Sequence, residues 1–484
     1  MHDALRASAV QLAAAIRDGR TTSRAVVDAH IAAIQKVNPA INAVVCDRFE
    51  AARAEADAAD AAVSAGATLP PLHGVPCTIK EAIQLEGMPN TSGLRRREGI
   101  VSTEDATTVA RLRAAGAIPL GVTNVSELCM WMESDNLVYG RTNNPYDVRR
   151  TAGGSSGGEG AIVGAGASPF GLGADVGGSI RMPAFFNGVF GHKPTGGLIP
   201  GTGQHPCGHG EVLRYQTTGP LCRRAEDLWP LVKILAGPDG VDTGCLDWPL
   251  GDPDTVDLSG LRVLDIPTNG VTRPWRELRQ AQVRAAEHLR RLGADVQTVE
   301  IPGFKDGFPI WAASLGAENG VPFAELMGDG ERVNASKELA KWAARRGDHT
   351  PMASILALAE DLLALVPQDQ QRFVDKGLAL REELEDRLGE HGVLLYPPYY
   401  RSAPRHSWPL LRQVLFMRFD YQYTALLNIL QVPVTQVPLR LDSRGLPLGV
   451  QVGARRGADH LTVAVARELE RAFGGWKPPP MARR

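Results

Sequence analysis

The sequence has few cysteines and no long hydrophobic run. Six cysteines are spread over 484 residues without a CxxC pair, which favours reduced thiols over disulfides or a thiolate zinc site. Residues 1–18 alternate apolar and charged side chains, so they lack both the apolar stretch of a signal peptide and a bilayer-spanning segment. These absences predict a cytoplasmic protein with no integral membrane segment.

The chain also lacks an excess of either charge. Its 52 basic and 54 acidic residues give a formal net charge of −2, whereas a nucleic-acid-binding protein usually presents a basic face to the phosphates. We therefore expect no nucleic-acid partner. Hydrophobic residues make up 44% and charged residues 22% of the chain, which is ordinary for a globular protein and excludes a disordered or fibrous one.

Helix and strand patterns alternate along the chain. Helical spacing of apolar residues recurs through residues 3–64, where the Asn-Pro pair at 38–39 is expected to end the second helix. Apolar, β-branched runs predict strands at 75–80 and 117–123, and again in the C-terminal half. This mixture implies an α/β fold in which helices cover a sheet. No repeat or linker is visible, so we expect one domain over residues 1–484.

Residues 303–425 differ in composition from the rest of the chain. Many aromatic side chains, such as Trp311, Tyr399 and Tyr400, stand there among charged ones. Two interpretations remain open. These aromatics line an apolar substrate pocket, which would make the segment a variable lid region, or they are ordinary core residues of a peripheral helical layer.

Two glycine-rich segments each place serine where the backbone is free to turn. Residues 151–160 hold Ser155 and Ser156 among glycines directly before a helix-compatible run, and residues 173–183 present Ser179 on a glycine turn. A phosphate cradle would need the Lys-Ser/Thr ending of a P-loop, which is missing. The turn at Ser179 instead suits a nucleophile, although a buried turn serine is the plain structural alternative.

A serine nucleophile needs a base. The 11 histidines occur without a GxSxG elbow in its usual context, so lysine is the next candidate. Lys80 ends the strand expected at 75–80, and burial there would disfavour its ammonium form, because desolvation penalises a charge. A solvent-exposed lysine at a strand end is the alternative.

Together, these segments resemble the amidase signature family. The resemblance rests on Lys80, on Gly-Gly-Ser-Ser-Gly-Gly at 153–158 and on Gly-Gly-Ser-Ile-Arg at 177–181. The spacing fits as well, with 75 positions from Lys80 to Ser155 and 24 from Ser155 to Ser179. Further matching segments are 126–131, 139–147, 182–188, 191–194, 218–220 and 445–451. Within the family, the chain looks most like the fatty-acid amide hydrolases of the second type, without their N-terminal membrane segment.

The resemblance implies both the fold and the site residues. The fold would be a single α/β/α domain with a mixed β-sheet between helical layers. Ser179 would be the nucleophile, Ser155 the middle member on a cis Gly154–Ser155 peptide, and Lys80 the ultimate base. The backbone amides that would hold the oxyanion are those of Val176, Gly177, Gly178 and Ser179. Met130 and Trp131 resemble positions that face the substrate, with plain core packing as the alternative. Ser156 would support the site by hydrogen bonding, and Asp175 and Arg181 would brace the Ser179 turn by hydrogen bonding or as an ion pair.

The implied reaction is hydrolysis of a C–N acyl bond in a small apolar molecule through an acyl-enzyme, without a metal or cofactor. Amides, anilides and carbamates (urethanes), and also esters, are the expected substrate classes. His205, Cys207 and His209 have metal-ligand side chains, but a short Gly/Pro loop rarely fixes a tetrahedral site. A homodimer is compatible with the sequence.

Two other functions remain open. The first is a glutaminase-type subunit of a tRNA-dependent amidotransferase, although residues 216–220 depart from the glutaminase-like pattern. The second is a non-catalytic binding protein on the same fold, which the intact Lys80, Ser155 and Ser179 argue against. Ammonia release from glutamine identifies the first, and failure of a fluorophosphonate to label Ser179 identifies the second.

Overall fold

One large sheet organises the molecule. The computed structural model describes residues 4–318, 321–363, 370–406 and 421–483. Within these residues, eleven strands form the sheet in the order β1-β3-β2-β6-β8-β7-β12-β13-β11-β9-β10. Their bounds are β1 Val44–Asp47, β2 Val75–Lys80, β3 Ala117–Thr123, β6 Phe170–Asp175, β7 Phe190–Lys193, β8 Thr217–Cys222, β9 Arg262–Asp265, β10 Asp295–Thr298, β11 Gly392–Tyr396, β12 Val434–Leu441 and β13 Pro447–Ala454. A separate pair is formed by β4 Asp135–Asn136 and β5 Gly140–Arg141.

The sheet is mixed, as expected. Strand β2 runs parallel to both β3 and β6, and β9 runs parallel to β10 and β11, whereas β6, β8, β7, β12 and β13 follow one another in antiparallel order. All six residues of β2 are buried, which is typical of a parallel strand covered on both faces. The strands predicted at 75–80 and 117–123 are confirmed.

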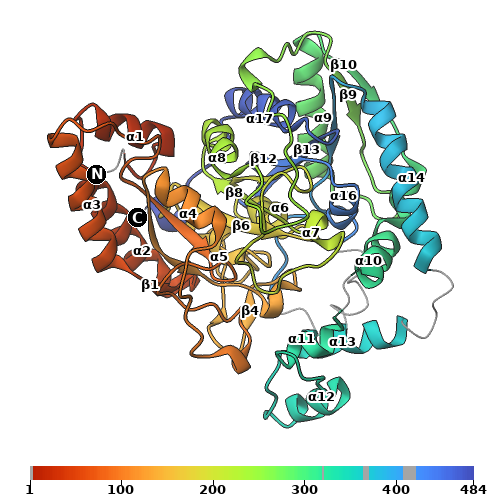
Figure 1. The fold of residues 1–484 in the computed structure, drawn as a ribbon. Helices are drawn as coiled ribbons and strands as arrows, with labels where there is room; N and C mark the ends of the chain where they lie inside the picture. The colour runs from red at the N-terminus through yellow and green to blue at the C-terminus, as the bar shows by residue number, and fades with distance from the viewer. Residues whose placement is uncertain (1–3, 319–320, 364–369, 407–420, 484) are drawn as a thin grey trace.

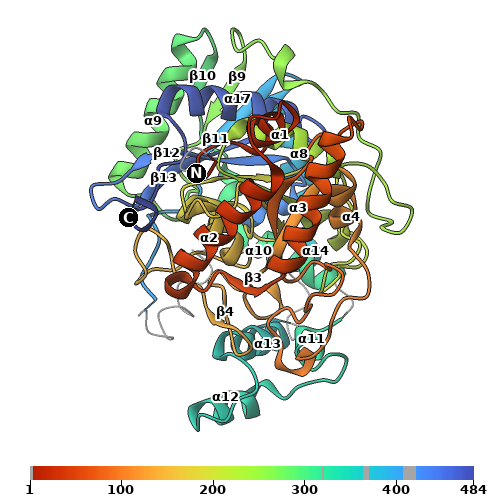
Figure 2. The same ribbon diagram turned by 90° about the vertical axis from the view of Figure 1, so that its left-hand side faces the viewer.

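Helices lie around this sheet (Figures 1 and 2). Their bounds are α1 Ala9–Arg17, α2 Ser23–Ile41, α3 Phe49–Ser64, α4 Thr107–Ala114, α5 Gly157–Gly164, α6 Arg181–Phe186, α7 Val212–Tyr215, α8 Leu228–Leu235, α9 Arg276–Arg291, α10 Gly307–Glu318, α11 Phe323–Met327, α12 Ala335–Ala343, α13 Pro351–Leu363, α14 Gln370–Leu388, α16 Ala425–Ile429, α17 Asp459–Phe473 and α18 Pro480–Arg483. The prediction of a single α/β domain built on a mixed sheet is confirmed. No helix among the described residues is long and apolar enough to cross a membrane.

Helix α2 does not end at the Asn-Pro pair. It continues through Pro39 to Ile41 and stops at Asn42, whose φ of 48° is left-handed. Proline lacks one backbone N–H, so it removes only one hydrogen bond when it stands this close to a helix end. The Asn38 side chain stabilises the residues that follow the helix, because its Oδ1 accepts hydrogen bonds from the N–H groups of Ala43 and Val44 at 2.8 and 2.9 Å.

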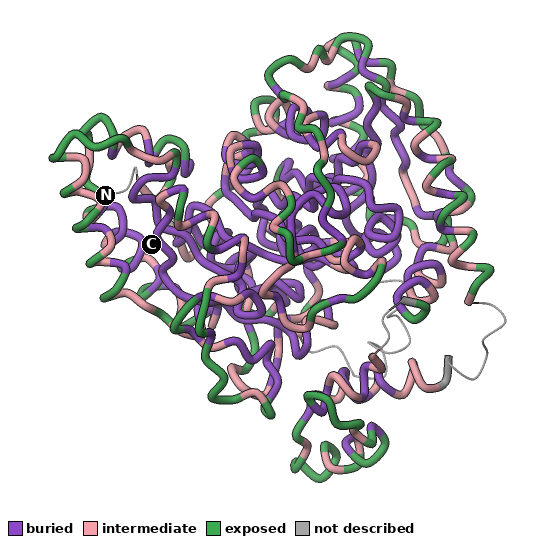
Figure 3. The backbone as a smooth tube through the Cα atoms, viewed as in Figure 1, coloured by how far each residue is buried: buried purple, intermediate pink, exposed green. Residues whose placement is uncertain are grey.

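The burial pattern locates the core and one outlying lobe. Buried backbone fills the centre of the molecule around the sheet (Figure 3). Helices α11–α13 lie at one end in both ribbon views and have a small core of their own with Leu94 and Leu128. These helices belong to the segment 303–425, of which residues 319–320, 364–369 and 407–420 lie outside the described part of the chain.

Candidate active site

Lys80 and Ser155 are in direct contact in the interior. Lys80 is the last residue of β2, and its Nζ donates a hydrogen bond to Ser155 Oγ at 2.8 Å, with the Ala174 carbonyl oxygen 3.5 Å away. Both side chains are only 1% exposed. The Gly154–Ser155 peptide is cis, as the resemblance implied. A solvent-exposed lysine at a strand end is therefore excluded, and the amine contacts both the Ser155 hydroxyl and the Cys129 thiol.

The second serine segment lies directly beside the first. The Ser156 N–H donates to the Ser179 carbonyl oxygen at 3.2 Å. The Ser156 hydroxyl exchanges hydrogen bonds with the backbone of Ala174, donating to its oxygen at 3.2 Å and accepting from its nitrogen at 3.3 Å. Ser156 thus ties the glycine-rich loop to the end of β6, from which the Ser179 turn departs. Ser179 is 7% exposed, more than Lys80 or Ser155.

The Ser179 turn is fixed through its peptide groups. Trp311 Nε1 donates to the Val176 oxygen at 2.8 Å, Thr424 Oγ1 donates to the Gly177 oxygen at 2.6 Å, and the Met182 N–H donates to the Gly178 oxygen at 2.7 Å. The C=O and the following N–H of a trans peptide point in opposite directions. Each donor to a carbonyl therefore also sets where the next amide points.

The backbone amides of the Ser179 turn differ in whether they already donate a hydrogen bond to the protein. The Gly178 N–H donates to Asp175 Oδ1 at 2.7 Å. Within the described residues, the N–H groups of Val176, Gly177 and Ser179 donate no hydrogen bond to protein. Gly178 has a φ of 122°, and a Cβ at this position would collide with the Thr424 side chain, so only glycine fits.

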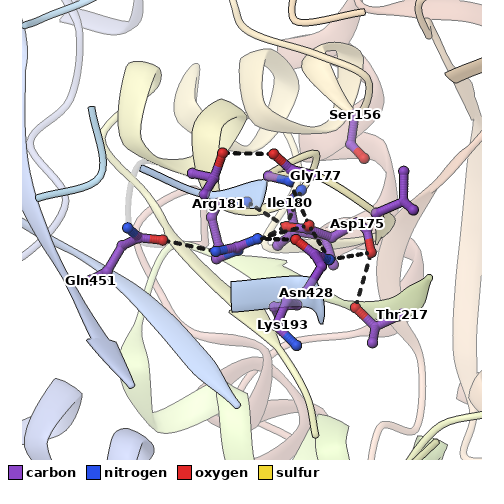
Figure 4. Close-up of polar contacts among 12 residues, drawn as sticks. Ser156, Asp175, Gly177, Ile180, Arg181, Lys193, Thr217, Asn428 and Gln451 are labelled. Carbon is purple, nitrogen blue, oxygen red and sulfur yellow. Dashed lines mark hydrogen bonds and ion pairs between the residues drawn. The ribbon is translucent and has the colours of Figure 1, made fainter. Parts of the chain in front are cut away.

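A network of buried polar side chains, centred on Asp175 and Arg181, contacts the Ser179 turn (Figure 4). Asp175 accepts from the Arg181 guanidinium through both oxygens at 3.0 Å and from the Ile180 N–H at 3.0 Å. Asn428 Nδ2 contacts Asp175 at 3.0 Å, and Gln451 Oε1 accepts from Arg181 Nη1 at 3.0 Å.

The electrostatics of this network follow from its pairing. Burial alone would raise the pKa of Asp175, but the charge and hydrogen bonds of Arg181, with Asn428, hold it well below the usual range. Asp175 and Arg181 form an ion pair with both side chains fully buried. This pair joins the residue before the turn to the residue after it.

Met130 and Trp131 lie near aromatic residues that come from the segment 303–425. Tyr421 stacks on Trp311 with ring centroids 5.5 Å apart and planes 9° apart, and it lies 6.2 Å from the Trp131 ring. Its hydroxyl donates to the Met130 oxygen at 3.4 Å. A Cβ added to Gly177 would meet the Trp311 indole at 3.3 Å, so this aromatic group lies against the Ser179 turn.

Two residues that hold the Ser179 turn, Thr424 and Asn428, carried no local signal in the sequence, because ordinary apolar residues follow or precede them. Gln451 stood out only as the last residue of a segment that resembles the family. Trp311 was visible only as a member of an aromatic-rich segment. The loop with His205, Cys207 and His209 gathers no metal site, because the described residues contain no group of three His, Cys, Asp or Glu side chains placed to hold an ion.

Comparison with known proteins gives the family. The family model described as Amidase matches residues 25–463. The chain belongs to the amidase signature family. It is 48% identical to fatty-acid amide hydrolase 2-B of Danio rerio, over 98% of this chain and 91% of that protein, which confirms the expected resemblance to the second type. It is 31% identical to the acylamidase of Rhodococcus erythropolis, over 96% of this chain and 94% of that protein.

A solved structure supports the same assignment. The structure of 6-aminohexanoate cyclic dimer hydrolase superimposes with a TM-score of 0.82 at 27% identity, covering 99% of each chain. The protein is thus an amidase, a hydrolase that acts on C–N bonds other than peptide bonds and takes small-molecule amides as substrates.

Proposed function

We propose that this amidase cleaves amides of apolar acyl groups through an acyl-enzyme on Ser179, with Lys80 and Ser155 as its proton relay. The observation that carries the proposal is the 2.8 Å contact between Lys80 Nζ and Ser155 Oγ in a site closed to solvent. Uncharged Lys80 takes a proton from Ser155, Ser155 takes one from Ser179, and the Ser179 oxygen attacks the acyl carbon.

The negative charge that forms on the carbonyl oxygen needs donors already in place. Of the four amides predicted for this role, we assign it to Val176, Gly177 and Ser179, whose N–H groups meet no protein acceptor in the described part of the chain. Gly178 acts differently, because its N–H already donates to Asp175. When the tetrahedral intermediate collapses, the relay runs backwards and protonates the leaving amine. Water then attacks the acyl-enzyme by the same route.

The substrate class follows from the side chains beside the turn. Trp131, Trp311 and Tyr421 present aromatic surface there, and Met130 adds an apolar side chain. Aromatic and apolar side chains at this place favour a substrate with an apolar acyl or leaving group. Trp311 and Tyr421 come from the segment 303–425, so we assign that segment the role of a substrate-pocket or lid region. Anilides, carbamates and esters present the same carbonyl to Ser179 and belong to the same proposal.

A covalent probe tests the nucleophile. A fluorophosphonate should add once to the folded wild-type chain, with the adduct mapped to Ser179 by mass spectrometry, and Ser179→Ala should take up no probe and show no turnover. Ser156→Ala is the matched control, since it removes a nearby hydroxyl outside the relay, and it should still be labelled. An adduct elsewhere, or none on folded wild-type protein, would contradict the proposal and favour a binding protein on this fold.

A substrate panel tests the chemistry. Anilides, esters and carbamates of graded acyl length should show kcat/KM rising with acyl length, and glutamine should release no ammonia. Ammonia release from glutamine at a rate comparable to that of the best amide would instead indicate a glutaminase.

A further inference from the structure

A buried carboxyl group lies beside Lys80 and has no part in the proposed relay. Glu159 stands in the first turn of α5 and is 0% exposed. Its oxygens contact the hydroxyls of Thr78 and Thr123 at 2.7 and 2.8 Å. Thr78 is two residues before Lys80 on β2, hence on the same face, and Thr123 pairs with Lys80 in the β2–β3 register. Glu159 therefore reaches the sheet where the amine stands.

The surroundings of Glu159 offer it hydroxyl groups and no charged donor. Within the described residues, no backbone N–H, guanidinium or ammonium donates to this carboxyl group. Asp175, the buried carboxylate of the turn, instead accepts from the Gly178 and Ile180 N–H groups and from Arg181. A buried anion with two hydroxyl donors is strongly disfavoured, because its lost hydration is poorly replaced.

A protonated Glu159 satisfies the same contacts. With hydrogen on Oε2, it donates to Thr78 Oγ1 across the 2.7 Å contact, and Thr123 still donates to Oε1. The Thr78 hydrogen then points toward Ser168 Oγ at 3.4 Å, and Ser168 donates to the Phe170 oxygen at 2.7 Å. In this series of hydrogen bonds, the carboxylic acid and the Thr78 and Ser168 hydroxyls each have an acceptor, and the series ends at the backbone carbonyl of Phe170.

The sheet is built to receive this side chain. A Cβ on the neighbouring Gly171 of β6 would overlap Glu159 Oε2. Burial raises the pKa of Glu159 to about 8, although hydrogen bonds from Thr78 and Thr123, and Lys80 when it is in its ammonium form, lower it. Two thiols titrate near these groups. On β2, burial and then Glu159 raise the pKa of Cys77, and burial raises the pKa of Cys129, whose thiol contacts Lys80 and Ser155.

We infer that Glu159 is a positioning residue held as a neutral carboxylic acid, so that it adds no negative charge beside Lys80 and leaves this amine available as an uncharged base. The inference rests on the proposed role of Lys80. An ionised Glu159 at this place would attract the ammonium form of Lys80 and so oppose its use as a base. A neutral acid fills the space, completes the hydroxyl chain and adds no charge.

The substitution Glu159→Gln tests the inference, because it keeps the shape and fixes the neutral state. We expect kcat/KM to stay within about threefold of wild type and the acid limb of its pH profile to keep its midpoint. If Glu159 were an anion in the working enzyme, its removal would shift that limb to lower pH by about one unit or more. Such a shift would overturn the inference. Ser168→Ala, which shortens the chain of hydroxyls without a charge, is the matched control.

A spectroscopic measurement covers the case in which the variant folds poorly. Wild-type protein with isotope-labelled glutamate should show, at neutral pH, the infrared carbonyl band of a buried protonated carboxylic acid. The absence of this band in wild type would overturn the inference. Fluorophosphonate labelling separates the two claims. Labelled Ser179 without the band leaves the proposed function standing and removes Glu159 from it, whereas the band without labelling supports the neutral acid and contradicts the proposed function.

Discussion

The hydroxyl of Thr424 donates to the Gly177 oxygen at 2.6 Å, although the two residues are 247 positions apart. This bond orients the peptide that joins Gly177 to Gly178, and hence the amide that Asp175 holds. Thr424→Val keeps the shape and loses the donor. We expect kcat to fall about three- to tenfold, because a neutral hydrogen bond contributes about 0.5–1.5 kcal/mol.

The matched control is Thr424→Ser, which retains the hydroxyl and should keep most of the rate. Steady-state kinetics on one amide substrate suffices for both variants. A full rate in Thr424→Val together with a loss in Thr424→Ser would mean that the methyl group, and not the hydrogen bond, supports the turn.

Trp311 should influence rate and substrate binding through different atoms. Its Nε1 fixes the Val176–Gly177 peptide, while its ring stacks on Tyr421. Trp311→Phe removes the donor and one of the two fused rings but keeps an aromatic side chain, so we expect kcat to fall about three- to tenfold with only a small change in KM for a long-chain amide. Trp311→Ala should in addition raise KM for long acyl chains more than for short ones. A KM increase independent of acyl length would place the ring outside the substrate pocket.

Lys80 should matter most where the leaving group needs a proton. Lys80→Ala is expected to lower kcat/KM for an amide by about 10²- to 10⁴-fold, the range of general acid–base catalysis. A matched ester, whose alkoxide leaves without prior protonation, should lose less. The measurement compares one acyl group on both leaving groups. Identical losses would show that the amine does not supply that proton.

Lys193 should make stability depend on pH. Burial and then the charge of Arg181 lower the pKa of Lys193 to about 7, against the attraction of Asp175 and Asp459. The unfolded chain keeps this lysine protonated at higher pH than the folded chain does, so the free energy of unfolding should rise as pH increases from about 7 toward 10.5, by at most about 1.4 kcal/mol per unit.

The variant Lys193→Met removes the titrating amine and keeps the length of the side chain. At pH 6 to 7, its melting temperature should exceed that of wild type by the largest amount. As pH increases, this difference should shrink on the order of a few degrees per pH unit. Parallel curves for the two proteins would show that Lys193 does not titrate in this range.

The sequence predicted those elements whose residues form a recognisable pattern within a short stretch of chain. The strands at 75–80 and 117–123 are runs of apolar and β-branched residues that stay buried on both faces, and the glycine-rich segments stand out by composition alone. The prediction that the second helix ends at residues 38–39 was wrong, because the helix continues to Ile41. One missing N–H near a helix end is tolerated, and the Asn38 side chain stabilises the residues that follow the helix.

The rest of the site depends on contacts that no local pattern encodes. Trp311, Thr424 and Asn428 meet the turn only because α10 and the start of α16 pack against it, across 135 to 253 positions of sequence. Glu159 was hidden for another reason. A glutamate in a glycine-rich loop suggests a solvent-facing residue, and its partners Thr78 and Thr123 are brought to it by two different strands.

The partners of the Ser179 turn have a consequence for how activity arises during synthesis. Trp311 and Thr424 are translated well over a hundred residues after Ser179. A chain that has left the ribosome only through residue 300 holds the proposed nucleophile and Lys80, but it lacks both Trp311 and Thr424, which hydrogen-bond to the turn. Hydrolytic competence should therefore appear late, once the C-terminal third has been added and folded onto the rest.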